Sequence, residues 1–199
     1  MPFVVVDGVI LAGGQSRRMG RDKASLLVAN KTLVSHLVEL MAPRVGQLII
    51  ARGEQPSLGA VAAAEDKLVV IRDFYRSSSE GPLSGLLAAM QLSGAEYLWV
   101  MTCDNYGLGG GILDALVQAV EESGADIAHA RIAGRAQPLL ALVSTRLAGS
   151  LEEYLESGQR SVMRWYGMQN TVVVDVVPES ANFSNINTPD DYQALLESL

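Results

Sequence analysis

The chain has 199 residues, of which 49% are hydrophobic and 19% are charged, and its formal net charge at pH 7 is −7. This composition is that of a globular protein with a sizeable core, and it excludes a disordered chain. The negative charge argues against a nucleic acid partner, because proteins that bind the phosphate backbone are basic. We expect a single domain over residues 1–199.

Cysteine content and hydropathy indicate the compartment. The single cysteine, Cys103, excludes an internal disulfide framework and fits a reducing cytosol. With only two scattered histidines, His36 and His129, the chain has no zinc-ligand spacing. Residues 1–3 lack the features of a signal peptide, and no apolar run approaches the ~18 residues of a membrane span. We therefore expect a soluble, cytoplasmic protein that does not bind a membrane.

The first part of the chain predicts short buried strands around a helix. An apolar run at residues 4–11 predicts a strand that leads into a glycine-rich loop. Apolar residues at helical spacing from Leu33 to Met41 predict a helix, which Pro43 ends. Continuous apolar runs at 48–50 and 68–71 predict two further strands, because strands of a parallel sheet are buried on both faces.

The middle of the chain continues this alternation. An alanine-rich segment from Pro56 to Ala64 predicts a loose helix, and the serine-rich segment from Phe74 to Glu80 predicts a loop. Pro82 predicts a helix start, because the N–H that proline lacks has no partner at the first helical position. Residues 97–102 predict the next strand.

The last part predicts, in chain order, a helix at 112–120, strands at 127–130 and 139–143, helices at 150–156 and 162–165, and a strand at 171–177. Thr188, followed by a proline and two acids, predicts the start of a final helix. The residues predicted to form the buried face of this helix are Tyr192, Leu195, Leu196 and Leu199. The alternation favours an α/β fold with a mostly parallel, Rossmann-like sheet.

The glycine-rich loop after the first strand is the most informative stretch. It holds three glycines, and Arg17, Arg18, Arg21 and Lys23 outnumber the single carboxylate of Asp22. Glycines let backbone N–H groups form an anion-binding concavity, to which guanidinium and ammonium groups add charge-assisted bonds to phosphate. The spacing fits neither a Walker loop nor a dinucleotide fingerprint. We predict that this loop binds a nucleoside triphosphate. The alternative is a flexible basic loop without a ligand, which the mutual repulsion of the cations disfavours.

Two carboxylates follow predicted strands. Asp73 ends the strand at 68–71, and Asp104 follows the strand at 97–102. Ligands of open α/β sheets bind outside the carboxyl ends of the strands, so both side chains are expected at the rim that holds the basic loop. Asp104 is predicted to bind Mg²⁺, which prefers oxygen ligands and bridges substrate phosphates. The alternative is an aspartate that caps the helix near Gly111.

Residues Leu11 to Lys23 resemble the signature Leu-Ala-Gly-Gly-x-Ser-x-Arg-Met-Gly-x-Asp-Lys of the molybdenum cofactor guanylyltransferases, within the nucleotidyltransferase superfamily. Segments similar to further motifs of this family follow in order: Asp73 with 81–85, Cys103-Asp104, 138–142, 153–160 and 185–189. Two positions depart from the pattern, since Tyr106 stands where a proline is usual and Gly53 where an asparagine often contacts the nucleotide. The resemblance implies a three-layer sandwich like that of the nucleotide-diphospho-sugar transferases.

The resemblance also implies a reaction, the transfer of GMP from GTP to the terminal phosphate of molybdopterin with release of pyrophosphate. The product is the guanine dinucleotide form of the molybdenum cofactor. The implied catalytic residues are Arg17, Arg18, Lys23 and Asp104, with Mg²⁺ on Asp104. The implied nucleotide-binding residues are Leu11, Ala12, Gly13, Gly14, Lys23, Asp73 and Asp104. The attacking phosphate is largely dianionic at neutral pH, so the reaction needs no general base.

Several assignments stay open. Arg160 and Ser161 are candidates to contact the pterin phosphate. Asn185 and Asn187 either support substrate or a second metal contact, or bond to their own backbone before the last helix. The aromatic pair Trp165–Tyr166 either stacks on the pterin or, as we favour, belongs to the core.

The alternatives for function are a related cytidylyl, cobinamide-phosphate or sugar-phosphate nucleotidyltransferase, and an inactive nucleotide-binding regulatory module. The related cytidylyltransferases have Leu-Ala-Ala-Gly, so Gly13 and Gly14 favour GTP. The resemblance leaves room for transient contact with other proteins of molybdenum cofactor synthesis or molybdoenzyme maturation.

Overall fold

A computed structural model gives the arrangement of residues 4–12, 23–52, 66–72, 81–178 and 184–198. Five sequence predictions lie outside these described residues: the basic loop at 13–22, the helix from Pro56 to Ala64, the loop from Phe74 to Glu80, the site role of Asp73 and the burial of Leu199.

The described strands are β1 (Val6–Leu11), β2 (Leu27–Val28), β3 (Lys31–Thr32), β4 (Leu48–Arg52), β5 (Leu68–Arg72), β6 (Tyr97–Thr102), β7 (Asn105–Tyr106), β8 (Ile127–Ile132), β9 (Arg135–Ser144), β10 (Thr171–Asp175) and β11 (Ser184–Asn185). The described α-helices are α1 (Leu33–Met41), α2 (Pro82–Leu92), α3 (Gly111–Ser123), α4 (Ala148–Glu156), α5 (Val162–Tyr166) and α6 (Pro189–Glu197).

Within the described part of the chain, seven strands form the main sheet in the order β10-β8-β9-β6-β1-β4-β5. β9 alone among them runs antiparallel to its neighbours, β6 and β8, while the other pairs are parallel. The predicted mostly parallel sheet is therefore confirmed. The central position of β1, between β4 and β6, places the ends of these three strands next to one another.

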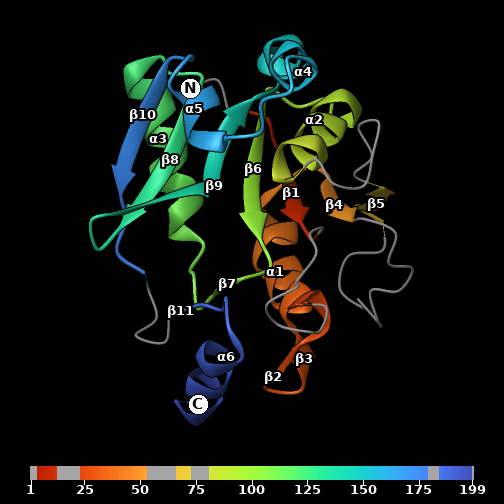
Figure 1. The fold of residues 1–199 in the computed structure, drawn as a ribbon, viewed down its shortest axis with the longest axis vertical. Helices are drawn as coiled ribbons and strands as arrows, with labels where there is room; N and C mark the ends of the chain where they lie inside the picture. Colours follow the sequence, from red (N-terminus) through yellow and green to blue (C-terminus); the bar gives the residue numbers. More distant parts are fainter. Residues whose placement is uncertain (1–3, 13–22, 53–65, 73–80, 179–183, 199) are drawn as a thin grey trace.

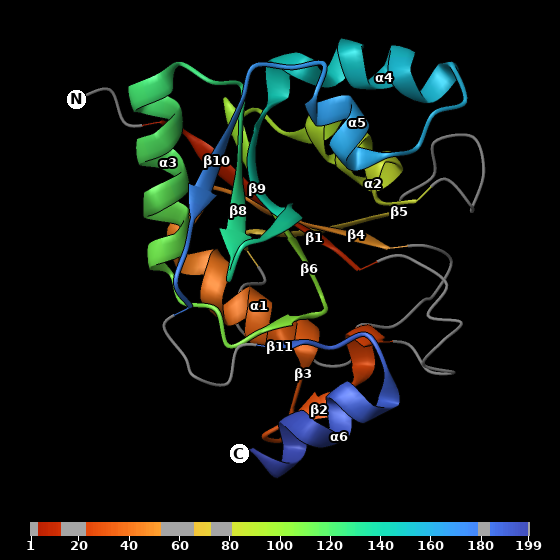
Figure 2. The ribbon, with the colours of Figure 1, turned by 60° about the vertical axis from the view of Figure 1, so that its left-hand side comes forward.

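Helices cover both faces of the sheet, which gives the predicted three layers (Figures 1 and 2). Alternate residues of each strand belong to different cores, as the period of a strand requires. In β1, Ile10 packs with residues of α1 and α3, whereas Val9 packs with residues of α2, α4 and α5. The inner strands β1, β4 and β6 are largely apolar because helices cover both faces of the sheet.

A third, smaller core lies beyond the carboxyl end of β6, where α6 lies beside the β2–β3 hairpin (Figures 1 and 2). Its buried members are Leu26, Val28, Leu33, Ile186 and Leu195. The Tyr192 hydroxyl donates to the carbonyl of Leu27 at 2.6 Å, which ties α6 to the hairpin. The end of the chain is thereby held against the segment that follows the basic loop.

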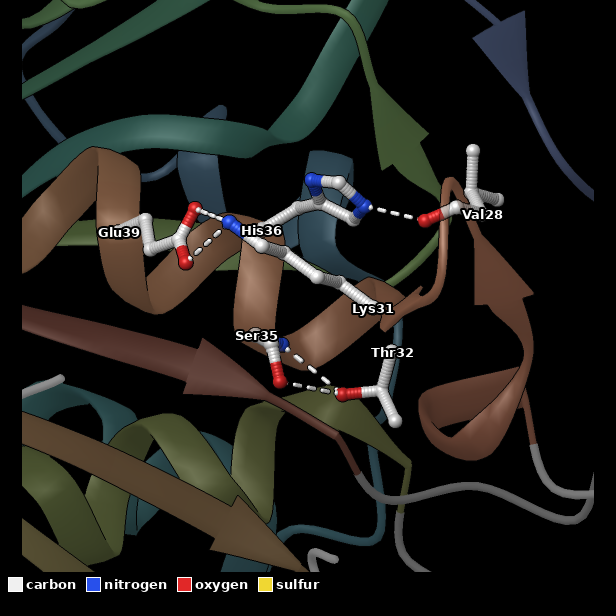
Figure 3. Close-up of polar contacts among 6 residues, drawn as sticks. All are labelled: Val28, Lys31, Thr32, Ser35, His36 and Glu39. Carbon is white, nitrogen blue, oxygen red and sulfur yellow. Dashed lines mark hydrogen bonds and ion pairs between the residues drawn. The ribbon is translucent and has the colours of Figure 1, made fainter. Parts of the chain in front are cut away.

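The β2–β3 hairpin is fastened to α1 by polar contacts (Figure 3). Thr32 caps the helix, since its Oγ1 accepts from the Ser35 backbone N–H at 3.1 Å. Within the first turn of α1, His36 Nε2 lies 2.9 Å from the carbonyl oxygen of Val28. Lys31 Nζ donates to Glu39 at 2.7 Å, an exposed pair that lowers the pKa of Glu39 and adds little stability.

Two predictions at the end of the chain need correction. The strand predicted to reach Val177 ends at Asp175, and Val177 is 87% exposed. The predicted cap at Thr188 and the burial of Leu195 are confirmed, but Leu196 is 39% exposed and was wrongly predicted to be buried. The small third core accommodates only a narrow stripe of α6.

No helix among the described residues is long and apolar enough to span a membrane.

Candidate active site

The two strand ends predicted to form the site are neighbours in the sheet. Leu11, the last residue of β1, is in register with Thr102, the last residue of β6. The backbone N–H of Ala12 donates to the carbonyl of Ala51 in β4 at 2.9 Å, so the start of the loop is still held by the sheet. Asp104 follows β6 by two residues and therefore lies at the same edge.

The side chain of Asp104 is half-buried and oriented by its neighbours. Thr102 Oγ1 donates a short hydrogen bond to Asp104 Oδ1, and Asn105 Nδ2 donates to Thr102 Oγ1 at 3.0 Å. The backbone carbonyl of Asp104 accepts from the Ile186 N–H at 2.9 Å. The alternative role as a helix cap is wrong, because α3 begins after Gly110 without a side-chain cap.

Lys23 and Asn187 meet at this edge although they are far apart in the sequence. Lys23 Nζ donates to Asn187 Oδ1 at 3.1 Å. Asn187 is held in turn by the start of α6, because its backbone N–H donates to Asp191 Oδ2 at 2.9 Å. This bond, followed by bonds from Thr188 and the charge of Lys23, lowers the pKa of Asp191. The asparagine amide thus contacts the lysine that directly follows the basic loop.

A cavity of about 250 Å³ opens beside Asp104. Its walls are formed by Thr102, Asp104, Asn105, Gln137, Pro138, Leu139, Leu140, Val162 and Asn187. One side is polar, with the carboxylate and amides, and the other is apolar, from β9 and the start of α5. Asp104 and Asn187 therefore line one recess, and Lys23 contacts Asn187.

Arg160 and Ser161 directly precede Val162, which lines this cavity, and both form hydrogen bonds with the backbone of neighbouring residues. Arg160 Nη1 donates to the carbonyls of Leu155 and Gln159, both at 2.7 Å. The Ser161 side chain caps α5 by accepting from the Arg164 N–H at 3.4 Å. A role in substrate binding stays a prediction for both residues.

The aromatic pair Trp165–Tyr166 belongs to the core, as favoured. Both side chains are buried, at 0% and 1% exposure. The Tyr166 hydroxyl donates to the carbonyl of Pro138 at 2.8 Å, and burial raises the pKa of this phenol. The bond fixes the part of β9 that lines the cavity.

The other predicted site residues are only partly placed. Gly13, Gly14, Arg17, Arg18 and Asp73 lie outside the described residues. For Asn185 the structure shows its backbone, which pairs with Asn105 between β11 and β7. Sequence reasoning missed Thr102 and Asn105 as partners of Asp104. Their position beside the carboxylate, two residues before it and one after it, was the available signal.

The donor set around Asp104 fits Mg²⁺. Among the described residues, no group of three His, Cys, Asp or Glu side chains could hold a metal ion. Mg²⁺ does not require one, because it keeps several waters and is held by one or two carboxylates together with substrate phosphates. Asp104 Oδ2 has no hydrogen-bond partner among the described residues, so one oxygen is available to a cation.

Comparisons with known proteins agree with this arrangement. The MobA-like NTP transferase domain is the family whose model matches, over residues 8–172. A molybdenum cofactor guanylyltransferase of Shewanella putrefaciens is 34% identical over 189 residues, which cover 94% of each chain. Molybdopterin-guanine dinucleotide biosynthesis protein A of Archaeoglobus fulgidus shares the fold, with a TM-score of 0.77 and 24% identity over 96% of this chain and 97% of that one.

A protein of Mycobacterium tuberculosis in complex with manganese also shares the fold, with a TM-score of 0.64 and 23% identity over 98% of this chain and 100% of that one. The family model and the relative that matches over 94% of each chain point to the same group of enzymes, and the solved structures share the fold. The chain therefore belongs to the molybdenum cofactor guanylyltransferases, which are nucleotidyltransferases with a MobA-like NTP transferase domain.

Proposed function

We propose that this enzyme transfers GMP from GTP to the terminal phosphate of molybdopterin, releases pyrophosphate and forms the guanine dinucleotide form of the molybdenum cofactor. The observation that carries this proposal is the meeting of Lys23, Asn187 and Asp104 at the edge where β1 and β6 end. The names of the relatives and the signature from Leu11 to Lys23 support the same reaction.

The chemical demand of the reaction is charge neutralisation and in-line positioning, because a phosphate dianion attacks without a base. Mg²⁺ held by Asp104 would supply part of the charge when it is bound and would bridge the phosphates. The manganese in the Mycobacterium tuberculosis protein supports a divalent cation in this fold.

The basic loop supplies the remaining charge in this proposal. Lys23 stabilises the leaving pyrophosphate, together with Arg17 or Arg18. Asn187 keeps the Lys23 ammonium at the site through their hydrogen bond. Leu11, Ala12, Gly13 and Gly14 bind the guanine with backbone groups, and Asp73 contributes a further contact to the nucleotide. These nucleotide contacts are assigned from the resemblance to the motifs of the family.

The cavity beside Asp104 accepts the second substrate in this proposal. Its volume of about 250 Å³ is below the roughly 300 Å³ at which pockets for whole drug-sized ligands begin. We therefore assign it to the phosphate-bearing end of molybdopterin, whose remainder extends outward past Arg160 and Ser161. The apolar wall from β9 and α5 excludes water from the attacking phosphate.

Pyrophosphate release tests the proposal. The enzyme is mixed with molybdopterin, Mg²⁺ and one of GTP, CTP, ATP or UTP, and with a sugar phosphate or cobinamide phosphate as rival acceptors. We expect release with GTP and molybdopterin, and a product that contains guanine. Release with CTP in place of GTP would show a cytidylyltransferase, and binding of GTP without any release would show a regulatory module.

We further propose that residues 1–199 form one nucleotidyltransferase domain that acts in the cytoplasm. The presence of a single cysteine, the buried Cys103, supports a reducing compartment. Transient contact with other proteins of molybdenum cofactor synthesis or molybdoenzyme maturation completes this proposal, because the product is a cofactor that other proteins use.

A further inference from the structure

We infer that Thr102 and Asn105 are positioning residues for Asp104, which hold one carboxylate oxygen so that the other is presented to the divalent cation. The inference rests on the proposed role of Asp104 as the metal ligand. It concerns two side chains that line the cavity assigned to molybdopterin but are not assigned to the metal, and that act on the metal through the carboxylate.

The direction of the hydrogen bonds follows from the chemistry of the three groups. An ionised carboxylate only accepts, so the single hydroxyl proton of Thr102 is directed at Asp104 Oδ1. The hydroxyl oxygen then accepts from an amide proton of Asn105, at 3.0 Å. If the Asn105 amide were flipped, its oxygen would face the Thr102 hydroxyl oxygen, whose only proton is already donated to Asp104. The order of donation is therefore from Asn105 to Thr102 and from Thr102 to Asp104.

Both supporting residues are anchored in β-structure. Thr102 is the last residue of β6 and is in register with Leu11 of β1. Asn105 is 6% exposed, and its backbone pairs with Asn185 in the antiparallel β7–β11 ladder. The chain of hydrogen bonds therefore connects the carboxylate to two residues whose backbones are paired in β-ladders.

This support matters because Asp104 is the carboxylate that we assign to the metal among the described residues. An aspartate at a strand end rotates about its side-chain bonds unless a neighbour fixes it, and fixing it costs conformational entropy when the metal binds. With Oδ1 engaged by Thr102, Oδ2 is presented in one orientation before the metal arrives. Loss of such outer partners typically weakens metal affinity about 10- to 100-fold.

The test is the affinity of Mn²⁺ for the full chain at saturating GTP, measured by the relaxation of water protons. We expect Thr102→Val to weaken binding at least about 10-fold, and Thr102→Ser, which keeps the hydroxyl, to bind nearly as wild type. Asn105→Leu should fall between them, because the hydroxyl remains but is no longer held. The KM for Mg²⁺ in pyrophosphate release should be highest for Thr102→Val, intermediate for Asn105→Leu and close to the wild-type value for Thr102→Ser.

Two controls separate the possible failures. Thr145→Val removes a hydroxyl that donates to the carbonyl of Ala95 at 2.7 Å, at the other end of β6, and should leave Mn²⁺ affinity unchanged. Asp104→Asn should lose Mn²⁺ binding. If Asp104→Asn loses it while folded Thr102→Val and Asn105→Leu bind within about twofold of wild type, our inference alone is overturned. If Asp104→Asn binds normally, the proposed metal ligand is wrong and the inference falls with it.

Discussion

The Lys23 ammonium donates to the side-chain oxygen of Asn187 at 3.1 Å, across 164 positions of the sequence. The first residue follows the basic loop, and the second precedes the last helix. Since Ile186, next to Asn187, also donates its N–H to the backbone carbonyl of Asp104, one short segment contacts both the Lys23 ammonium and the main chain of Asp104. The packing of α6 against the β2–β3 hairpin therefore holds in place the segment that contacts Lys23 and Asp104.

The first prediction concerns Lys23 itself. Lys23→Ala removes a positive charge from the leaving pyrophosphate, and we expect the turnover number to fall about 100-fold or more, as for lost oxyanion donors. Pyrophosphate release with GTP and molybdopterin measures it. Lys31→Ala is the matched control, because Lys31 forms an exposed pair with Glu39 and should change turnover little. Near-normal turnover in Lys23→Ala would remove this residue from the mechanism.

A double-mutant cycle tests whether Asn187 acts through Lys23. Asn187→Ala leaves the ammonium without its acceptor at 3.1 Å, so we expect lower turnover in the single variant. In the Lys23→Ala background the same change should have a much smaller effect, because residues in direct contact are not additive. Full additivity of the two changes would show that Asn187 contributes independently, for example by its own contact with substrate.

Much of the layered fold was predictable because its signals are local. Strands buried on both faces have continuous apolar runs, and β6 was predicted with its observed bounds, Tyr97–Thr102. The turn at Gly134 predicted the connection of β8 to β9. Asp104 and the start of the basic loop were placed at one edge because parallel strands share an edge for their carboxyl ends.

What escaped prediction depends on contacts between distant segments. β7 and β11 have two residues each, too few for a pattern, and they exist because one pairs with the other. The β2–β3 hairpin turns at Ala29 and Asn30, both with positive φ, and lacks the glycine that would have indicated it. The bond between Lys23 and Asn187 has no sequence signal beyond the presence of both residues in family motifs.

The turn between β8 and β9 predicts a stabilising change. Ala133 has φ 48° and Gly134 has φ 76°, the left-handed backbone of a two-residue hairpin turn, which alanine adopts at a cost. Ala133→Asn gives the favoured Asn-Gly pair and should raise the free energy of unfolding by up to about 1 kcal/mol. Ala133→Val, β-branched at the same φ, should lower it. Urea unfolding measures both, and equal stability of the two variants would contradict the argument.

The last prediction concerns how the stability of the α6 cap depends on pH. Hydrogen bonds from the backbone of Asn187, then from Thr188, lower the pKa of Asp191 below its ordinary value of 3.8. A carboxyl whose folded pKa is lowered stabilises the fold above the unfolded pKa, and this contribution disappears as the pH falls through the folded pKa. Asp191→Asn should therefore lower the melting temperature by a few degrees at pH 7, and the difference from wild type should shrink below pH 3.8.

Asp190→Asn is the control, because the neighbouring acid in the same helical turn does not form the capping box. Thermal melts between pH 7 and pH 3 measure all three proteins. The wild-type and Asp191→Asn curves should converge at low pH because protonation removes the charge that the variant lacks at every pH. A difference that stays constant down to pH 3 would show that the cap depends on the shape of the side chain and not on its charge. Loss of the cap should also loosen Asn187, so Asp191→Asn should raise the KM for GTP at pH 7 while Asp190→Asn does not.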